Sequence, residues 1–254
     1  MKFSVTKEIK LLSLAFLFSF TGFDGVQQYI TTFFSHIGLP RIGFQSLILI
    51  YLFFTLADPL SAVVVSKYGA KKSMAIGILF YVLFILALMT KSMIFIYLAS
   101  SLLGIAASLL WTGQNSYLVR ATTDDNRGAN AGFFGTLLSL GSAAGVISLG
   151  FLIAKFSYQS SFLLAALLPF IGLVFIFRLK DLRSEKSENH LHLLRKAITS
   201  KTAWQLSTIW FSVSFVYGLA IGLIPIEIKN ISTCEIASHK SLLQAARLSG
   251  VAES

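Results

Sequence analysis

Long apolar runs alternate with short polar connections along most of this chain. Several of the runs approach the ~20 residues that an α-helix needs to cross the hydrocarbon core of a bilayer. They do not show the alternation over ~10 residues that is typical of a membrane β-barrel. The pattern therefore predicts an all-α integral membrane protein. The predicted membrane segments are roughly 11–34, 44–65, 73–90, 93–117, 129–154, 159–178 and 204–226.

The connections divide the chain into parts of different character. Six segments joined by short loops predict a six-helix N-terminal transmembrane bundle over residues 1–178. The longer connection 179–203 is rich in Lys, Arg, Glu and Ser and predicts a cytoplasmic linker loop. A seventh helix over 204–226 would begin an incomplete C-terminal bundle, and the tail 227–254 is polar. We interpret the chain as truncated or frameshifted, with a tail unrelated to the preceding helices.

Composition agrees with a membrane protein. Of the 254 residues, 55% are hydrophobic and 13% are charged, whereas soluble domains carry about 25% charged residues. The opening "MKFSVTKEIK" resembles a signal peptide, but the apolar run after it is too long and no cleavage pattern ends it. It therefore predicts a retained first helix. The single cysteine, Cys234, excludes a disulfide within the chain and a multi-cysteine metal site.

The basic residues define an orientation. The formal net charge is +10, but the charges occupy loops between apolar runs, which argues against nucleic-acid binding. Most of the 21 Lys and Arg residues fall in loops on the same side as the N-terminus. Because cytoplasmic loops carry an excess of Lys and Arg, this places the N-terminus in the cytoplasm. A seven-helix receptor would face the opposite way.

The first segment contains a polar stripe. Its members fall on one face of a helix at 100° per residue. A carboxylate near the bilayer centre costs at least ~2.5 kcal/mol and should face a wet cavity or a partner. We favour a face that lines a pathway for substrate or a coupling ion, while a polar seam between helices is the alternative. The stripe comprises Thr21, Asp24, Gln27, Gln28 and Thr31.

A second intramembrane acid lies in the segment 44–65. Asp58 precedes Pro59, whose ring frees a backbone carbonyl and kinks a helix. A proton or ion site is one interpretation of Asp58. A buried carboxylate paired with a basic residue at the cytoplasmic end is the other, and we favour it slightly.

The stretch "SLLWTGQNSYLVRATTDDNRGAN" ends the fourth segment and begins the fifth. The spacing of the polar and aromatic residues predicts that one helix face holds Ser108, Trp111, Gln114, Asn115 and Leu118. Trp and Tyr commonly anchor a helix at the membrane interface, which would explain Trp111 and Tyr117. Anchoring does not explain Gln114 and Asn115. We therefore assign those two to the same pathway as Asp24, Gln27 and Gln28.

Two further patterns have structural explanations. Thr123, Asp124 or Asn126 could cap the helix over 129–154, with the acids at its N-terminus. Within that helix "GSAAG" is a small-x-x-x-small pattern that allows two helices to approach closely.

Enzyme chemistry is not indicated. The sequence has no Gly-rich phosphate loop, no HExxH, no Cys/His cluster and no nucleophile with its base. We therefore expect neither a cofactor nor a metal site.

The order of six helices, a long cytoplasmic loop and a further helix resembles the first half of a major facilitator superfamily transporter. The loop "AVVVSKYGAKKSM" resembles that superfamily's G-x-x-x-D-R-x-G-R-[KR] signature, with Ala62 and Ser66 in place of the usual glycine and aspartate. The resemblance implies a gating loop, although the missing acid argues against a salt bridge in it. The residues that match in type are Lys67, Gly69, Lys71 and Lys72.

The segment "LLGIAASLLWTGQNSYL" resembles the Unc-ninety-three-like branch of the superfamily. Ser100 stands where many proton-coupled members have arginine, and the fifth segment has no proline, so proton coupling of the usual kind is not indicated. The matching positions are Gly104, Trp111, Thr112, Gly113, Gln114 and Tyr117.

This resemblance implies alternating-access transport of a small solute. The alternative is a non-transporting membrane scaffold that regulates a channel or a trafficking partner. The expected partners are accordingly the lipid bilayer, an unidentified solute and, for the scaffold, another membrane protein.

Overall fold

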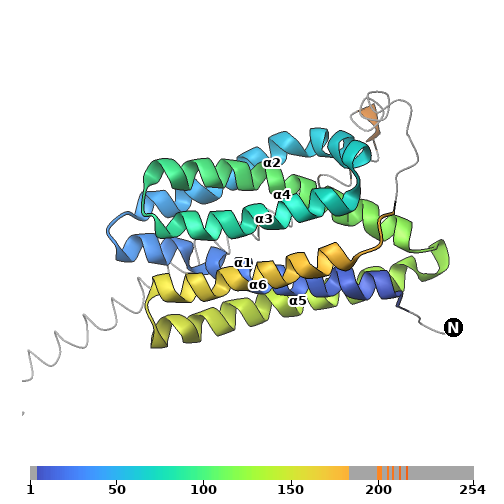
Figure 1. Cartoon of the computed structure of the whole chain (residues 1–254). Helices are drawn as coiled ribbons and strands as arrows, with labels where there is room; N and C mark the ends of the chain where they lie inside the picture. The colour runs from blue at the N-terminus through green and yellow to red at the C-terminus, as the bar shows by residue number, and fades with distance from the viewer. Residues whose placement is uncertain are drawn as a thin grey trace, which may run out of the picture.

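The computed structural model describes residues 5–182 and, beyond them, only residues 199–201, 205, 208, 212 and 216. Six helices fill the continuous part, and all six are long and apolar enough to cross a membrane. They confirm a multi-pass, all-α membrane protein (Figure 1). The helices are α1 (Lys7–His36), α2 (Pro40–Tyr68), α3 (Ala70–Met89), α4 (Met93–Ala121), α5 (Asp124–Lys155) and α6 (Tyr158–Arg178).

Most of the helices extend a few residues beyond the apolar segments that predicted them. Helix α5, for example, begins at Asp124 rather than near residue 129. Helix α1 begins at Lys7 and is capped by Thr6, whose side-chain oxygen accepts a hydrogen bond from the N–H of Ile9 at 3.3 Å. Hydropathy marks the part inside the hydrocarbon core, whereas the helices continue into the polar interface. The segments were therefore right in number and position within residues 5–182.

The predicted linker 179–203, the seventh helix 204–226 and the tail 227–254 fall almost entirely outside the described residues. These three divisions of the chain stay predictions.

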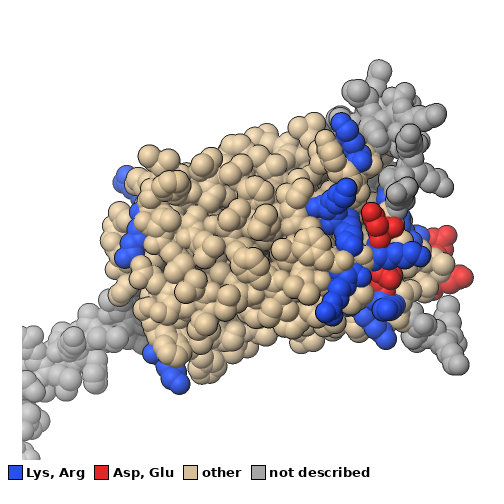
Figure 2. Space-filling view, viewed as in Figure 1, with Lys and Arg blue, Asp and Glu red and all other residues tan. Residues whose placement is uncertain are grey.

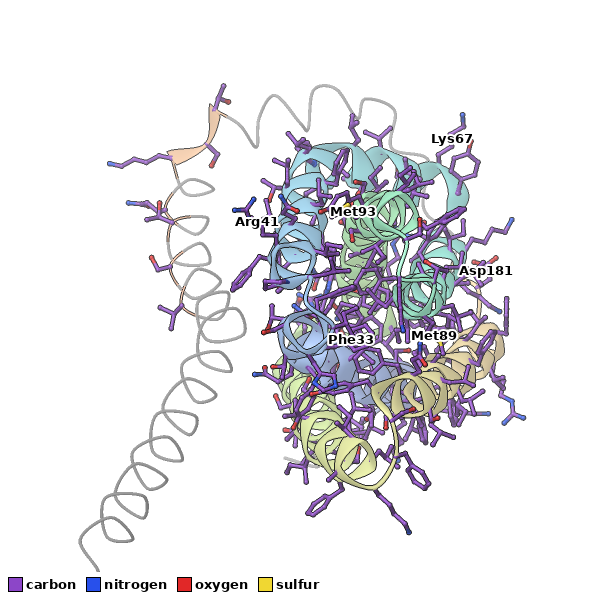
Figure 3. The ribbon with its side chains drawn as sticks, turned by 90° about the vertical axis from the view of Figure 1, so that its left-hand side faces the viewer. Phe33, Arg41, Lys67, Met89, Met93 and Asp181 are labelled. Atoms are coloured by element: carbon purple, nitrogen blue, oxygen red, sulfur yellow. The ribbon has the colours of Figure 1, made fainter. Side chains whose placement is uncertain are left out.

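Helix α1 is the central element of the bundle. It packs against α5, α6 and α2, while α4 packs against α2 and α3, and α3 also meets α6. Viewed from the end of the bundle that carries Arg41 and Met93, α2, α1 and α5 follow one another along one side (Figure 3). In the most apolar stretch of α1, 61% of the residues are buried, against 17% in both α2 and α5. The α2–α1–α5 face is therefore flanked by the two least enclosed helices.

Glycines bring α1 and α5 into backbone contact. A Cβ added at Gly25 would lie 2.7 Å from the carbonyl oxygen of Gly145, and one added at Gly141 would lie 2.6 Å from that of Leu17. Such an approach is possible only without side chains at these positions. The structure confirms that "GSAAG" is a packing pattern and identifies α1 as the partner helix.

The charges gather at the two ends of the bundle and leave the middle bare (Figure 2). The end that holds the N-terminus carries most of the described basic residues, and the opposite end carries Arg41, Lys91 and Lys155. This agrees with a cytoplasmic N-terminus under the positive-inside rule.

Candidate functional site

A polar cluster lies near the middle of the bundle, where α1 meets α2 and α5. The hydroxyl of Ser142 on α5 donates a hydrogen bond to Asp24 Oδ2 on α1. One turn further along α1, Gln27 Nε2 donates to the hydroxyl oxygen of Tyr51 on α2 at 2.7 Å. Asp24 is also close enough to Tyr51 to act on it electrostatically. Three helices thus bring together four polar side chains in a mainly apolar protein.

The predicted stripe on α1 divides into two kinds of position. The hydroxyl of Thr21 donates a hydrogen bond to the carbonyl oxygen of Leu17 at 2.7 Å, and the backbone of Thr21 contacts Gly145 of α5. The side chain of Thr31 is 1% exposed, and its backbone contacts Gly43 of α2. These threonines form a seam between helices, as in the alternative interpretation. Asp24 and Gln28 are only partly buried, and Gln27 reaches Tyr51. The middle of the stripe therefore differs from its ends.

Helix α2 adds a second polar stripe that continues from the cluster. Tyr51, Thr55 and Asp58 are exposed and share one face of the helix through spacings of four and three residues. The interpretation of Asp58 as a buried partner of a basic residue is wrong. Asp58 is exposed, and no ion pair to it is found among the described residues. Helix α2 itself continues through Pro59.

The two amides predicted on α4 are separated by the structure. Gln114 is 3% exposed, whereas its neighbour Asn115 is exposed. Trp111 packs its ring against Phe16 and Phe20 of α1, with centroids 5.6 and 5.2 Å apart. On the predicted common face, Ser108, Trp111, Gln114 and Leu118 are buried or partly buried, and Asn115 is exposed.

The other residues of the α4 signature pack helices together. A Cβ on Gly104 would meet Phe53 Cβ and the N–H of Phe54 on α2, both at 2.9 Å. One on Gly113 would meet Met74 Cγ of α3 at 3.0 Å. Thr112, between these contacts, is partly buried. Gly104 and Gly113 hold α4 close to its two neighbours.

Tyr117 belongs to a polar network at the cytoplasmic end. Its side chain is fully buried, so it is not an interfacial anchor. The hydroxyl lies 2.9 Å from Glu8 Oε2 and 3.0 Å from the carbonyl oxygen of Lys180, and the N–H of Lys180 donates to the same Glu8 oxygen at 3.1 Å. This network joins the cytoplasmic ends of α1, α4 and α6.

The lysines of the predicted gating loop have different surroundings. Lys71 Nζ donates to the carbonyl oxygens of Phe177 and Leu179 at 2.8 Å each, at the end of α6. Gly69 allows the turn between α2 and α3, because its φ of +92° is one that other residues rarely adopt. Lys67 and Lys72 are exposed. Asp181, which follows α6 in the sequence, lies near this turn: its Oδ1 atom would be 3.9 Å from a Cβ added at Gly69.

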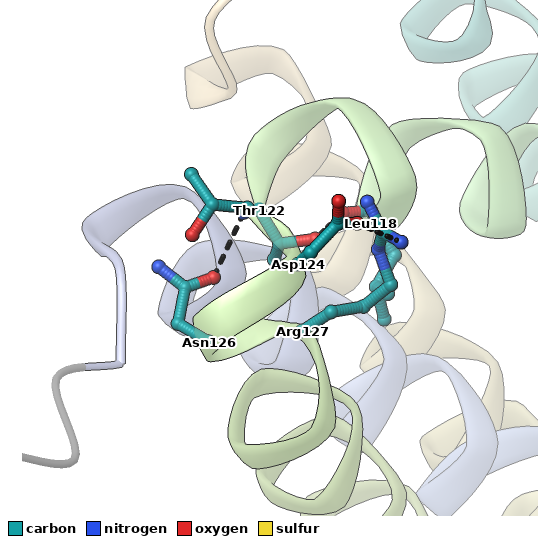
Figure 4. A network of polar contacts seen from close by, with 6 residues as sticks. Leu118, Thr122, Asp124, Asn126 and Arg127 are labelled. Atoms are coloured by element: carbon teal, nitrogen blue, oxygen red, sulfur yellow. Dashed lines mark hydrogen bonds and ion pairs between the residues drawn. The ribbon is translucent and has the colours of Figure 1, made fainter. Parts of the chain in front are cut away.

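The turn between α4 and α5 forms the predicted helix cap. Thr123 and Asn126 make a reciprocal capping box, with the N–H of Thr123 donating to Asn126 Oδ1 at 2.9 Å (Figure 4). Arg127 pairs with Asp124 at 2.7 Å. Asn130 extends the cap to α1, since its Oδ1 accepts from the N–H of Thr6 at 3.0 Å. The turn has the structural role that was favoured for it.

Sequence reasoning missed Tyr51 and Ser142. The spacing of Tyr51, Thr55 and Asp58 was a usable signal for the first. Ser142 gave none, because one serine beside the glycines of α5 is ordinary in a packed helix. Its approach to Asp24 depends on how α5 sits against α1.

A helical bundle with a polar cluster near mid-depth and two poorly enclosed flanking helices has the architecture of half of a membrane transporter. The sequence profile of the Major Facilitator Superfamily matches residues 7–252, and the chain belongs to that superfamily. Its fold is similar to that in "In meso crystal structure of the POT family transporter PepTSo", with a TM-score of 0.62 and 16% identity. That match covers 87% of this chain and 51% of the transporter.

Among curated proteins the chain is similar to UNC93-like proteins. It is 31% identical over 113 residues to "UNC93-like protein 3" of Arabidopsis thaliana, covering 44% of this chain and 23% of the relative. It is also 31% identical over 133 residues to "UNC93-like protein MFSD11" of Xenopus tropicalis, covering 51% and 30%. A third relative is "Putative potassium channel regulatory protein unc-93" of Caenorhabditis elegans, 29% identical over 46% of this chain and 16% of the relative. The matches thus span less than a third of each relative.

Proposed function

We propose that the bundle forms one wall of a solute pathway that works by alternating access. The observation that carries this is the mid-depth cluster of Asp24, Gln27, Tyr51 and Ser142 between α2 and α5. Polar side chains inside a membrane are costly and mark pathways for substrates or ions. Gln28, partly buried on α1, adds a polar group to this wall. We also propose Asn115, exposed on α4, and the buried Gln114 as pathway residues, on the basis of their polarity in a membrane helix.

Membership of the superfamily supports this proposal. In such transporters the solute binds between two halves near the membrane midplane, and the halves rock around it. The described bundle has the fold of one half, and the match covers 51% of the structurally similar transporter. The α2–α1–α5 face is the surface that the opposite half would cover. Lys71, Gly69 and the network around Tyr117 then hold the cytoplasmic end of the half rigid while it rocks.

A second candidate is a scaffold that regulates another membrane protein. One similar protein carries the name of a putative potassium channel regulator. A scaffold would use the apolar outer surfaces of the helices to bind its partner, and the mid-depth cluster would have no solute.

Uptake into proteoliposomes separates the two. The full-length protein is reconstituted, and uptake is measured for a panel of neutral, anionic and cationic solutes, with protein-free vesicles as background. Uptake above background that falls at least about tenfold in Gln27→Leu, and less than about twofold in Asp125→Asn at an exposed acid in the first turn of α5, supports the transporter. No uptake of any solute by folded protein favours the scaffold.

A further inference from the structure

The middle of the described bundle carries negative charge alone. Every Lys, Arg and His in α1–α6 lies in a terminal turn of its helix, and so do Glu8, Asp124 and Asp125. The remaining charged residues of the six helices are Asp24 and Asp58. Both lie well inside the apolar zone, which is bare of blue and red on the face shown in Figure 2. The formal charges along the middle of this wall are therefore negative, which is unfavourable for an anionic solute.

Asp24 has no opposite charge among the described residues. Its neighbours on α2 and α5 are Tyr51 and Ser142, and Gln27 lies one turn away on α1, so all of its polar surroundings are neutral. A hydrogen bond from one serine offsets only part of the loss of hydration of a carboxylate. A carboxylate that is removed from water is stable only when it is paired with a cation or protonated.

The cluster has two oxygen atoms to which no described residue donates. Ser142 donates to Asp24 Oδ2, and Gln27 donates one of its two amide N–H groups to Tyr51, which leaves Asp24 Oδ1 and Gln27 Oε1 as acceptors. The second N–H of Gln27 and the hydroxyl hydrogen of Tyr51 are donors, so the charge of Asp24, and not the hydrogen-bond pattern alone, selects the occupant. Carboxylate and carbonyl oxygens are ligands of hard cations and acceptors for ammonium groups. Asp58 lies two turns along the same face of α2 as Tyr51, which places a second negative charge toward the cytoplasmic end.

We propose that the species bound at this wall is a cation, held by Asp24 and Gln27, with Asp58 at the cytoplasmic approach. This rests on the proposed pathway and adds the charge of its occupant. The positive charge has two possible sources, a cationic solute or a proton, and both neutralise the same carboxylate.

Two measurements on the full-length protein test the proposal. The first is binding of radiolabelled tetraethylammonium and of ²²Na⁺ to the purified protein. The second is proteoliposome flux of these probes, and of protons with a pH-sensitive dye inside the vesicles. Each is made for wild type, for Asp24→Asn and for Asp125→Asn, a matched control at an exposed acid in the first turn of α5.

We expect cation binding, or proton flux, to fall at least about tenfold in Asp24→Asn and to change less than about twofold in Asp125→Asn. Loss of tetraethylammonium or ²²Na⁺ binding identifies a cationic solute or ion, and loss of proton flux alone identifies a proton. Cation binding that depends on Asp24 without any flux would support the proposed cation site and contradict the proposed transport. Uptake of neutral or anionic solutes alone, unchanged in Asp24→Asn, would support the proposed transport and contradict the proposed cation site. Neither binding nor flux would overturn both.

Discussion

The hydroxyl of Tyr117, near the end of α4, lies 2.9 Å from Glu8 Oε2 at the start of α1, although 109 positions separate the two residues in the sequence. The same carboxylate oxygen accepts from the N–H of Lys180, just after α6. One acidic side chain therefore joins three helix ends on the cytoplasmic side. The apolar packing of the bundle alone would not fix these ends relative to one another.

Replacing Tyr117 with phenylalanine should destabilise the bundle. The change keeps the buried ring and removes one hydrogen bond to a charged acceptor, which costs about 1–3 kcal/mol. The apparent Tm in detergent should fall by several degrees. The control is Tyr68→Phe, since the Tyr68 side chain is 57% exposed and should tolerate the change. Equal Tm values for the two variants would contradict a stabilising role for the hydroxyl.

Lys71→Met should loosen the end of α6. Lys71 bonds two carbonyl oxygens there, where a cation also interacts favourably with the helix dipole, for about 0.3–1 kcal/mol. Hydrogen exchange in the last turn of α6 should become faster in Lys71→Met than in wild type. Lys72→Met is the matched control at an exposed neighbour. If both variants exchange alike, Lys71 does not cap α6.

Alanine should have opposite effects at two glycines of α5. At Gly145 a Cβ would lie 2.8 Å from the backbone carbon of Thr21, and overpacking of this kind costs about 1–3 kcal/mol. At Gly132 nothing lies within 4 Å, and alanine is a better helix former by about 1 kcal/mol. Gly145→Ala should thus lower the apparent Tm and Gly132→Ala should raise it. A higher Tm for Gly145→Ala would show that α1 and α5 are further apart.

The bond between Gln27 and Tyr51 can be measured with a double-mutant cycle. Stability is compared for wild type, Gln27→Leu, Tyr51→Phe and the double variant. A direct hydrogen bond predicts a coupling energy of about 1 kcal/mol, because the second change costs less once the first partner is gone. Strictly additive effects would mean that the two side chains do not interact.

The orientation predicts which turns face away from the cytoplasm. After replacement of Cys234 by serine, Ser157→Cys should react with a membrane-impermeant maleimide in intact cells that express the protein at their surface, because Ser157 lies between α5 and α6 at the end opposite the N-terminus. Asp125→Cys, at the cytoplasmic end, should react only after the membrane is opened. The reverse pattern would invert the topology.

Much of the fold could be predicted from the sequence, because lipid imposes a strong constraint on every spanning segment. Backbone groups in a bilayer core must be satisfied within the segment, so length and hydropathy suffice to locate helices. All six helices in residues 5–182 were found this way. The cap before α5 was found from its residue types, because Thr and Asn side chains favour helix N-termini. The polar stripe of α1 was also visible, since helical periodicity needs no knowledge of neighbours.

The candidate site could be predicted only in part. Asp24 and Gln27 stood out as polar residues in an apolar run, but their partners Ser142 and Tyr51 come from other helices. Asn115 was assigned with Gln114 from spacing, and the structure exposes one and buries the other. Adjacent residues point in directions 100° apart, so which of them faces inward depends on where the neighbouring helices lie.

The sequence by itself determined the membrane class and the helices of the described bundle, and it predicts their orientation, since hydropathy and loop charge act locally along the chain. Tertiary structure alone decided which polar residues meet. Helix pairing depends on close contacts at particular glycines, such as Gly145 against Thr21, and these contacts set the rotation of each helix. That rotation brings Ser142 to Asp24 and Tyr51 to Gln27. Periodicity within one helix carries no information about the rotation of another.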